Sequence, residues 1–152
     1  MNATEVSIVS TAVDYDPFAD VALARVVPAT ESQREIWLAA KLEPEASLAY
    51  NESVSIRLSG ELNVAALQAA LQGVVDQHEA LRATLSADGN ELCIAAHMEL
   101  DCFVRDLSEL DESRRDEDIS SALASAVGTP FDLERGPLVR AELLHQIGRA
   151  HV

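Results

Sequence analysis

Residues 63–95 have the sequence NVAALQAALQGVVDQHEALRATLSADGNELCIA, and the expected fold follows from this stretch. Apolar residues recur at steps of three and four after Asn63, whose side chain can cap a helix start, so the first half predicts an amphipathic helix. The second half predicts strands over 81–85 and 92–95. The turn Asp88-Gly89-Asn90 between them favours a hairpin, because glycine adopts a positive φ angle without strain.

The flanking sequence supplies further helices and strands. Thr30 and Gln33 have the spacing of a capping box, which indicates a helix start. Period-two alternation and helical spacing predict four more elements: a helix over 31–42, a strand over 50–58, a helix beginning in the charged run 111–118, and a strand over 138–144. Helices and strands alternate irregularly, so the expected fold class is α/β or α+β, with a mixed sheet and flanking helices.

Length and charge narrow the possible functions. The 152 residues suffice for one ordinary domain, and 48% hydrophobic residues allow a packed core. Lys and Arg number 11 against 26 Asp and Glu, a net charge of -15 that opposes nucleic acid and anionic membrane partners. Cys93 and Cys102 lack the spacing of a disulfide framework or a zinc site. No signal peptide or membrane span is apparent, so a cytoplasmic location is expected.

Two motifs carry a resemblance to a known family. Residues 30–37, TESQREIW, are similar to S-x-A-Q-x-R-L-W and keep Gln33 and Trp37, although Glu35 stands where that motif usually has Arg. Residues 77–85, QHEALRATL, are similar to R-H-E-x-L-R-T-x-F and keep His78, Glu79, Leu81 and Arg82. Together with Tyr50-Asn51, Pro130-Phe131-Asp132-Leu133 and Gly136-Pro137, in this order, they resemble the amino-terminal part of a condensation domain of non-ribosomal peptide synthetases.

The resemblance implies a fold, a reaction and partners. It implies a partial amino-terminal lobe, over 28–145, of the chloramphenicol-acetyltransferase-like fold, in which two lobes meet at a tunnel. Carrier-protein domains bring thioester substrates to that tunnel on phosphopantetheine, and the family joins them by amide formation. This chain itself is expected to hold no cofactor and no metal. The expected partners are carrier-protein domains and the missing remainder of the condensation domain.

The resemblance assigns no catalytic residue to this chain. The family's third motif, H-H-x-x-x-D-G, supplies its catalytic histidine, and it is absent from the sequence. The polypeptide is therefore expected to be inactive. Three alternatives stay open: a stand-alone acyltransferase of the same fold, a non-catalytic interaction module, and a parent domain of the epimerisation or heterocyclisation type.

The candidate site residues are structural ones: Gln33, Trp37, His78, Glu79 and Arg82. His78 could serve as a general base beside Glu79, but its place on the apolar face of the predicted helix favours a hydrogen-bonded core histidine. Trp37 is expected in the core. Arg82 is expected either to brace the lobe or to pair with a carboxylate, and Gln33 to cap its helix or to contact a neighbouring strand.

The acidic residues favour solvation over metal binding. Five carboxylates are concentrated between residues 111 and 118, and Arg114 and Arg115 are interleaved with them. Clusters of mixed sign are typical of a solvated helix face. The five are Asp111, Glu112, Asp116, Glu117 and Asp118.

Two stretches are assigned outside the lobe. Residues 1–27 show neither helical nor strand periodicity and are expected to form a leader or linker. Residues 146–152 include the string Ile-Gly-Arg-Ala-His-Val, which breaks the strand alternation before it. The codons ATC GGA AGA GCA CAC GTC TGA encode this string and a stop, and they resemble a common short-read sequencing adapter. A preceding AG would complete the codon CAG of Gln146.

We therefore expect residues 146–152 to be adapter read-through and the native sequence to end at about His145. Resequencing the locus tests this expectation. Different codons after His145 would support it, and the same codons in clean genomic DNA would contradict it.

Overall fold

A computed structural model describes residues 22–146 and 149–151. Seven strands, three α-helices and two 3-10 helices (η) follow one another along these residues. In chain order they are β1 (Leu23–Pro28), α1 (Glu31–Leu42), η1 (Pro44–Tyr50), β2 (Arg57–Ser59), α2 (Val64–Gln77), η2 (Glu79–Arg82), β3 (Ala83–Leu85), β4 (Glu91–Ala95), β5 (Cys102–Asp106), α3 (Glu112–Gly128), β6 (Ala141–Gln146) and β7 (Arg149–His151).

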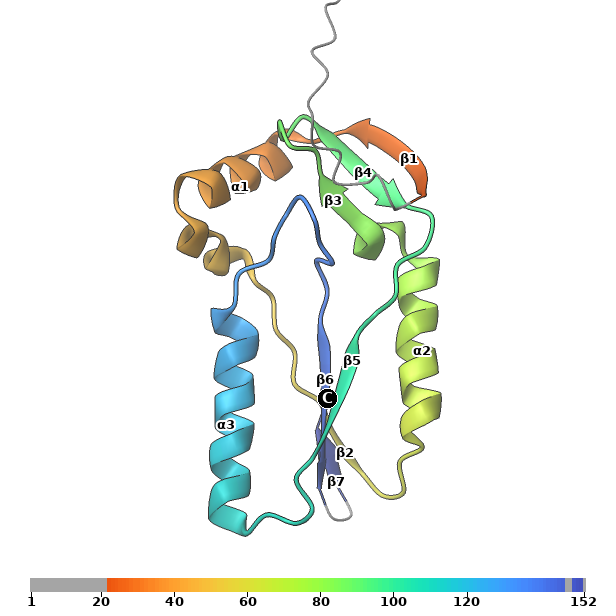
Figure 1. Ribbon diagram of the computed structural model, residues 1–152, viewed down its shortest axis with the longest axis vertical. Coiled ribbons are helices and arrows are strands. Elements are labelled where there is room, and N and C mark those ends of the chain that lie inside the picture. Colours follow the sequence, from red (N-terminus) through yellow and green to blue (C-terminus); the bar gives the residue numbers. More distant parts are fainter. Residues whose placement is uncertain (1–21, 147–148, 152) are drawn as a thin grey trace, which may run out of the picture.

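The strands form two sheets. The smaller has the order β1-β4-β3 and is antiparallel throughout. The larger has the order β2-β7-β6-β5, in which only the pair β5 and β6 is parallel. Figure 1 shows α1 beside the smaller sheet, and α3 and α2 on opposite faces of the larger one. The expected class, a mixed sheet with flanking helices, is confirmed.

The stretch 63–95 forms the predicted helix and hairpin, but residues 79–82 form η2, so the strand expected over 81–85 begins only at Ala83. The Asn63 carboxamide oxygen accepts from the Ala66 amide at 3.0 Å and starts α2. Strands β3 and β4 pair in register, with Ala83 opposite Ile94. In the turn between them Gly89 has a φ of 70°, the left-handed region that glycine favours.

The other predicted helices also begin at the expected residues. Thr30 and Gln33 form both hydrogen bonds of the capping box at the start of α1. The Asp111 carboxylate accepts from the Arg114 amide and starts α3, so the charged run 111–118 is a helix start. Carboxylates in this first turn are favourable, because they face the positive end of the helix dipole.

The core of the larger sheet lies between α3 and β6. Ala122 of α3 packs with Leu144 of β6 and with Leu107, which follows β5. The neighbouring Leu143 points to the opposite face of the sheet and has no exposed surface. Strand β6 is therefore buried on both faces, as a central strand between two helical layers requires.

The strand predicted over 50–58 is wrong over most of its length. Tyr50 ends η1, residues 51–56 belong to no ladder, and only 57–59 form a strand. Val54 and Ile56 are 79% and 52% exposed. Alternation of apolar and polar residues predicts which side chains share a face of a strand. A strand also needs a partner to form a ladder, and β7 pairs only with residues 57–59 of this stretch.

Three strands, β1, β5 and β7, were not predicted. Strand β1 lies in the stretch expected to be a linker, so the expected boundary at residue 28 falls within a strand. Five of the six residues of β1 and four of the five of β5 are exposed. Both are edge strands, and a strand exposed on both faces carries no alternation. Residues 1–21 lie outside the described residues.

The stretch 146–152 is described only in part. Gln146 ends β6, and residues 149–151 form β7 between β2 and β6. The origin of this stretch stays a prediction. In the described part of the chain no helix has the length and apolar character to cross a membrane.

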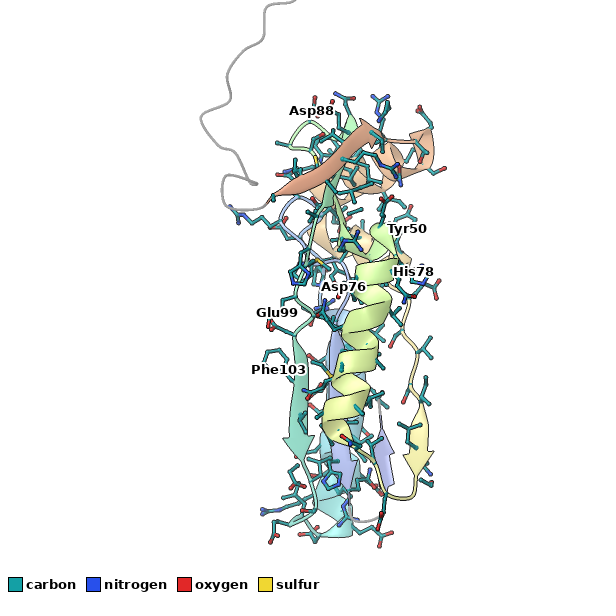
Figure 2. The ribbon with its side chains drawn as sticks, turned by 90° about the vertical axis from the view of Figure 1, so that its right-hand side faces the viewer. Tyr50, Asp76, His78, Asp88, Glu99 and Phe103 are labelled. Atoms are coloured by element: carbon teal, nitrogen blue, oxygen red, sulfur yellow. The ribbon has the colours of Figure 1, made fainter. Side chains whose placement is uncertain are left out.

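The exposed edge of the larger sheet predicts self-association. Phe103 of edge strand β5 is 70% exposed and projects away from the sheet (Figure 2). Phe103→Lys should reduce association, because a charge on an edge strand opposes strand pairing. Salt should increase association of the unmodified chain, since screening limits the repulsion of its -15 charge to roughly 8 Å.

Light scattering at low and high salt measures this effect. Leu42→Lys is the matched control, because Leu42 is 79% exposed at the end of α1, away from any strand. If both variants reduce association equally, charge alone is responsible and the edge of β5 is not the contact.

Candidate functional site

Trp37 joins three segments that are distant in sequence. Its ring lies so close to the hairpin turn that a Cβ on Gly89 would come within 2.5 Å of it. Its indole N–H donates to the Glu134 carboxylate at 3.2 Å, in the loop before β6. Lys41 pairs with the same carboxylate, and its Nζ lies 5.7 Å from the ring centroid. Trp37 is half-buried among polar partners, so its expected place in the core is wrong.

Asp88 holds the turn on which Trp37 rests. Its carboxylate accepts from the Ser86 hydroxyl at 2.6 Å and from the backbone and side-chain amides of Asn90 at 3.1 and 2.7 Å. These hydrogen bonds, that of Ser86 first, lower the pKa of Asp88 to about 2. An open pocket of about 210 Å³ lies beside this turn, lined by Asp88 and five α1 residues: Glu31, Arg34, Glu35, Trp37 and Leu38.

Arg82 is buried, and it joins α2 to β4. Its Nη1 donates to the carbonyls of Val75, at 2.7 Å, and Asp76, in the last turn of α2. Its Nε donates to the Ala95 carbonyl of β4 at 3.0 Å. A cation at the carboxyl end of a helix is favourable, because the unpaired carbonyls there carry negative charge. These contacts support the bracing role predicted for Arg82.

His78 and Glu79 lie on the surface. Helix α2 ends at Gln77, and the backbone turns at His78 into η2. Figure 2 shows His78 at the carboxyl end of α2, where it is exposed. The expected core histidine is therefore wrong, because helical periodicity stops before it. Glu79 forms an ion pair with Arg25 of β1, and both side chains are about half exposed.

The remaining family-like motifs meet at the end of α3. The Asn51 side chain donates to the carbonyls of Val127 and Thr129, at 3.2 and 3.1 Å. Arg140 donates to the same Thr129 carbonyl at 2.6 Å and lies 3.8 Å over the ring of Phe131. The motifs around Asn51 and Phe131 are visible in the sequence, but the individual roles of Asn51 and Arg140 were not predicted.

The hydrogen bonds of two glutamines of α2 were also not predicted from the sequence. Gln68 donates to the Cys102 carbonyl at 3.0 Å. Gln72 donates to the Met98 carbonyl at 2.9 Å and accepts from the Leu100 amide at 2.8 Å. They fix the connection between β4 and β5, and the only sequence signal for them is their i,i+4 spacing on one helix face.

The described residues contain two histidine–carboxylate pairs. His97 Nδ1 lies 3.2 Å from an Asp76 carboxylate oxygen, and His145 Nδ1 lies 3.3 Å from one of Asp106. Hydrogen bonds from Ser108, and then that of His145, lower the pKa of Asp106. Within residues 22–146 and 149–151, no group of three or more His, Cys, Asp or Glu side chains could hold a metal ion.

The motif residues therefore hold elements of the fold together. Comparison with known proteins identifies the family to which this fold belongs. The family model for the condensation domain matches residues 23–152. The chain belongs to the condensation-domain family. Chondramide synthase of Chondromyces crocatus is 41% identical over 131 residues, which cover 85% of this chain and 3% of the synthase. A linear gramicidin synthase polypeptide of Brevibacillus parabrevis is 34% identical over 130 residues, or 84% of this chain and 2% of that polypeptide.

Solved condensation domains share the fold of this chain. A mutant of the starter condensation domain of rhizomide synthetase RzmA superposes with a TM-score of 0.74 and 26% identity, over 84% of this chain and 31% of that one. The EpoB cyclization-docking bidomain from Sorangium cellulosum has a TM-score of 0.66 and 25% identity, over 83% and 25%. The expected family and its chloramphenicol-acetyltransferase-like fold are confirmed, and this chain spans about a third or less of the solved domains.

The contact between Trp37 and Gly89 predicts a steric effect. Gly89→Ala should lower the free energy of unfolding by roughly 1–3 kcal/mol more than Gly60→Ala. Both glycines have a positive φ, but a Cβ at Gly60 would meet nothing within 4 Å. Thermal unfolding with Trp37 fluorescence measures both variants. Equal losses would show that Trp37 does not rest on this turn.

The contacts of Arg82 predict a second stability difference. Arg82→Met should cost about 2–4 kcal/mol, because it leaves buried carbonyls of α2 and β4 without donors. The same change at the exposed Arg25 should cost about 1 kcal/mol or less, as is usual for surface ion pairs. Chemical unfolding measures both. Similar costs would contradict a bracing role for Arg82.

Proposed function

We propose that this chain is part of a non-ribosomal peptide synthetase and contributes the amino-terminal portion of its condensation domain. The observation that carries the proposal is the 41% identity to chondramide synthase across 85% of the chain. The proposed activity of the complete domain is amide formation between acyl or aminoacyl groups that carrier-protein domains hold as thioesters.

The proposed reaction is an acyl transfer. The amine nitrogen of one carrier-bound group attacks the thioester carbonyl carbon of the other. The C–N bond forms, the C–S bond breaks, the thiol of phosphopantetheine leaves, and the amine gives up one proton. Phosphopantetheine belongs to the carrier domains in this proposal, and this chain binds none of its own.

In the proposed reaction this chain has a structural role: it holds elements of the domain in place. Arg82 joins α2 to β4, and Trp37 joins α1 to the hairpin and to the loop before β6. These connections would hold one wall of the substrate tunnel. The proposed partners are the carrier domains and the rest of the condensation domain. The proposed location is the cytoplasm, without nucleic acid or membrane partners, which the charge of -15 disfavours.

Reading the uninterrupted gene is the first test of this proposal. Adenylation and carrier domains in the same frame would support it. A short completed second lobe alone would indicate a stand-alone acyltransferase, and a stop codon in genomic DNA directly after this stretch would indicate an interaction module.

Incubation with loaded donor and acceptor carrier proteins is the biochemical test. The 152-residue chain should form no dipeptide above a control without protein, because it contains no H-H-x-x-x-D-G motif. The complete domain should form it. Dipeptide from the short chain would overturn its structural role, and none from the complete domain with its own carriers would overturn the proposed activity.

A further inference from the structure

The turn between β3 and β4 contains a pair of residues that is chemically unstable in an unfolded chain. Asp88-Gly89 is the one Asp-Gly pair in the 152 residues, and the sequence has no Asn-Gly pair. In such a pair the glycine nitrogen can attack the aspartate side chain, because no Cβ on the glycine hinders the approach. Figure 2 shows Asp88 at the turn, at one end of the molecule, where it is exposed.

The reaction changes the path of the backbone. The Gly89 nitrogen attacks Cγ of Asp88, the C–N bond forms, and the N–H proton and the carboxyl hydroxyl leave as water, which closes a succinimide ring. Water then opens the ring at either carbonyl. One opening restores aspartate, and the other gives isoaspartate, in which the backbone runs through Cβ and Cγ of residue 88. Nothing is oxidised or reduced, and water is the only co-reactant.

Hydrogen bonds of the native turn hold both reacting groups. The Gly89 N–H donates to the Ser86 carbonyl at 2.9 Å. Oδ1 of Asp88 accepts from the Ser86 hydroxyl at 2.6 Å and from the Asn90 amide at 3.1 Å, and Oδ2 accepts from the Asn90 side chain at 2.7 Å. Either oxygen can leave only after its hydrogen bonds break, so ring closure requires the turn to open.

The native turn also keeps the Asp88 carboxyl in its unreactive form. Ring closure needs a protonated carboxyl, because the hydroxyl of that carboxyl leaves as water. The hydrogen bonds of the turn, that of Ser86 first, lower the pKa of Asp88 to about 2. At neutral pH the protonated fraction falls about tenfold for each unit by which a carboxyl pKa is lowered.

The product would not fit the native turn. Gly89 is buried against the ring of Trp37, and even a Cβ on Gly89 would come within 2.5 Å of that ring. Isoaspartate inserts one carbon into the backbone directly before Gly89, so Gly89 or Trp37 must move. The Asn90 carbonyl accepts from the Ala29 amide at 2.8 Å, so movement of the turn also reaches the segment that leads into α1.

We propose that Asp88 is a modification site controlled by the fold. The native turn protects it, isoaspartate forms when the turn opens, and the product prevents the turn from closing again on Trp37. Modification at Asp88 therefore separates the hairpin from α1. This inference goes beyond the proposed function and does not rest on it, because every contact it uses lies within the turn and α1.

Incubation of the chain at neutral pH, with and without urea, tests the protection. Asp-N protease cuts before aspartate and not before isoaspartate, so loss of the cut at Asp88, measured after complete unfolding, reports the product. The cut before Asp101, which Cys102 follows, is the internal control. We expect the cut at Asp88 to be lost at least about tenfold more slowly in the folded chain than in urea. Equal rates would overturn the protection.

Two variants of Ser86 test the hydrogen bond to Asp88. Ser86→Ala removes the hydroxyl donor and should speed isoaspartate formation in the folded chain at least about threefold. Ser86→Thr keeps a hydroxyl and should restore the slow rate. In urea all three chains should react at the same rate. Equal rates for the alanine and threonine variants in the folded state would contradict a protective role of this hydrogen bond.

The modified chain tests the effect on the turn. The chain with isoaspartate at residue 88, separated by chromatography, should have a lower Tm and altered fluorescence of Trp37, the single tryptophan of the sequence. A Tm and a fluorescence equal to those of the unmodified chain would show that the turn still closes on Trp37, against the proposal. No carrier protein or substrate is used, so the outcome of the condensation assay does not affect these results.

Discussion

The Arg82 guanidinium donates to three backbone carbonyls, and this contact holds the two halves of the structure in place. Two carbonyls belong to the last turn of α2 and one to β4. Burying a guanidinium is costly unless its donors are satisfied, so the arrangement holds only when the helix end and the strand are both in place. The smaller sheet and the helix that covers the larger sheet are thereby fixed to each other.

Other side chains also connect elements of the fold, by hydrogen bonds to backbone groups. Gln68 and Gln72 hold the segment between β4 and β5, and so determine where the edge strand of the larger sheet begins. Asn51 and Arg140 hold the end of α3. Such contacts fix the positions of elements without requiring a large hydrophobic core. Among the described residues, the buried cluster between α3 and β6 contains only Leu107, Ala122 and Leu144.

The residues of this chain that match the family motifs join elements of the fold to one another. Among the residues shared with the family motifs, Gln33 caps a helix, Trp37 joins three segments, and Arg82 joins two. His78 and Glu79 lie on the surface beside them. Under the proposed function these fixed contacts would keep one wall of the substrate tunnel rigid, because loosely held groups lose the orientation on which acyl transfer depends.

The local elements and the family could be predicted from the sequence. The capping box, the helical spacing of α2 and the glycine turn act within a few residues, so α1, α2 and the hairpin were predicted correctly. The family motifs identified the fold, because their order along the chain is specific. The second motif pointed to Arg82, although the sequence could not name its partners.

Strand pairing and side-chain contacts required the folded chain. Strands β1 and β5 are exposed edges without alternation, whereas 50–58 alternates and forms a ladder only where β7 reaches it. His78 is outside the core because α2 ends one residue before it, and Trp37 is outside it because Glu134, 97 residues away, accepts its N–H. These outcomes depend on contacts between distant residues, and spacing along the chain contains no information about them.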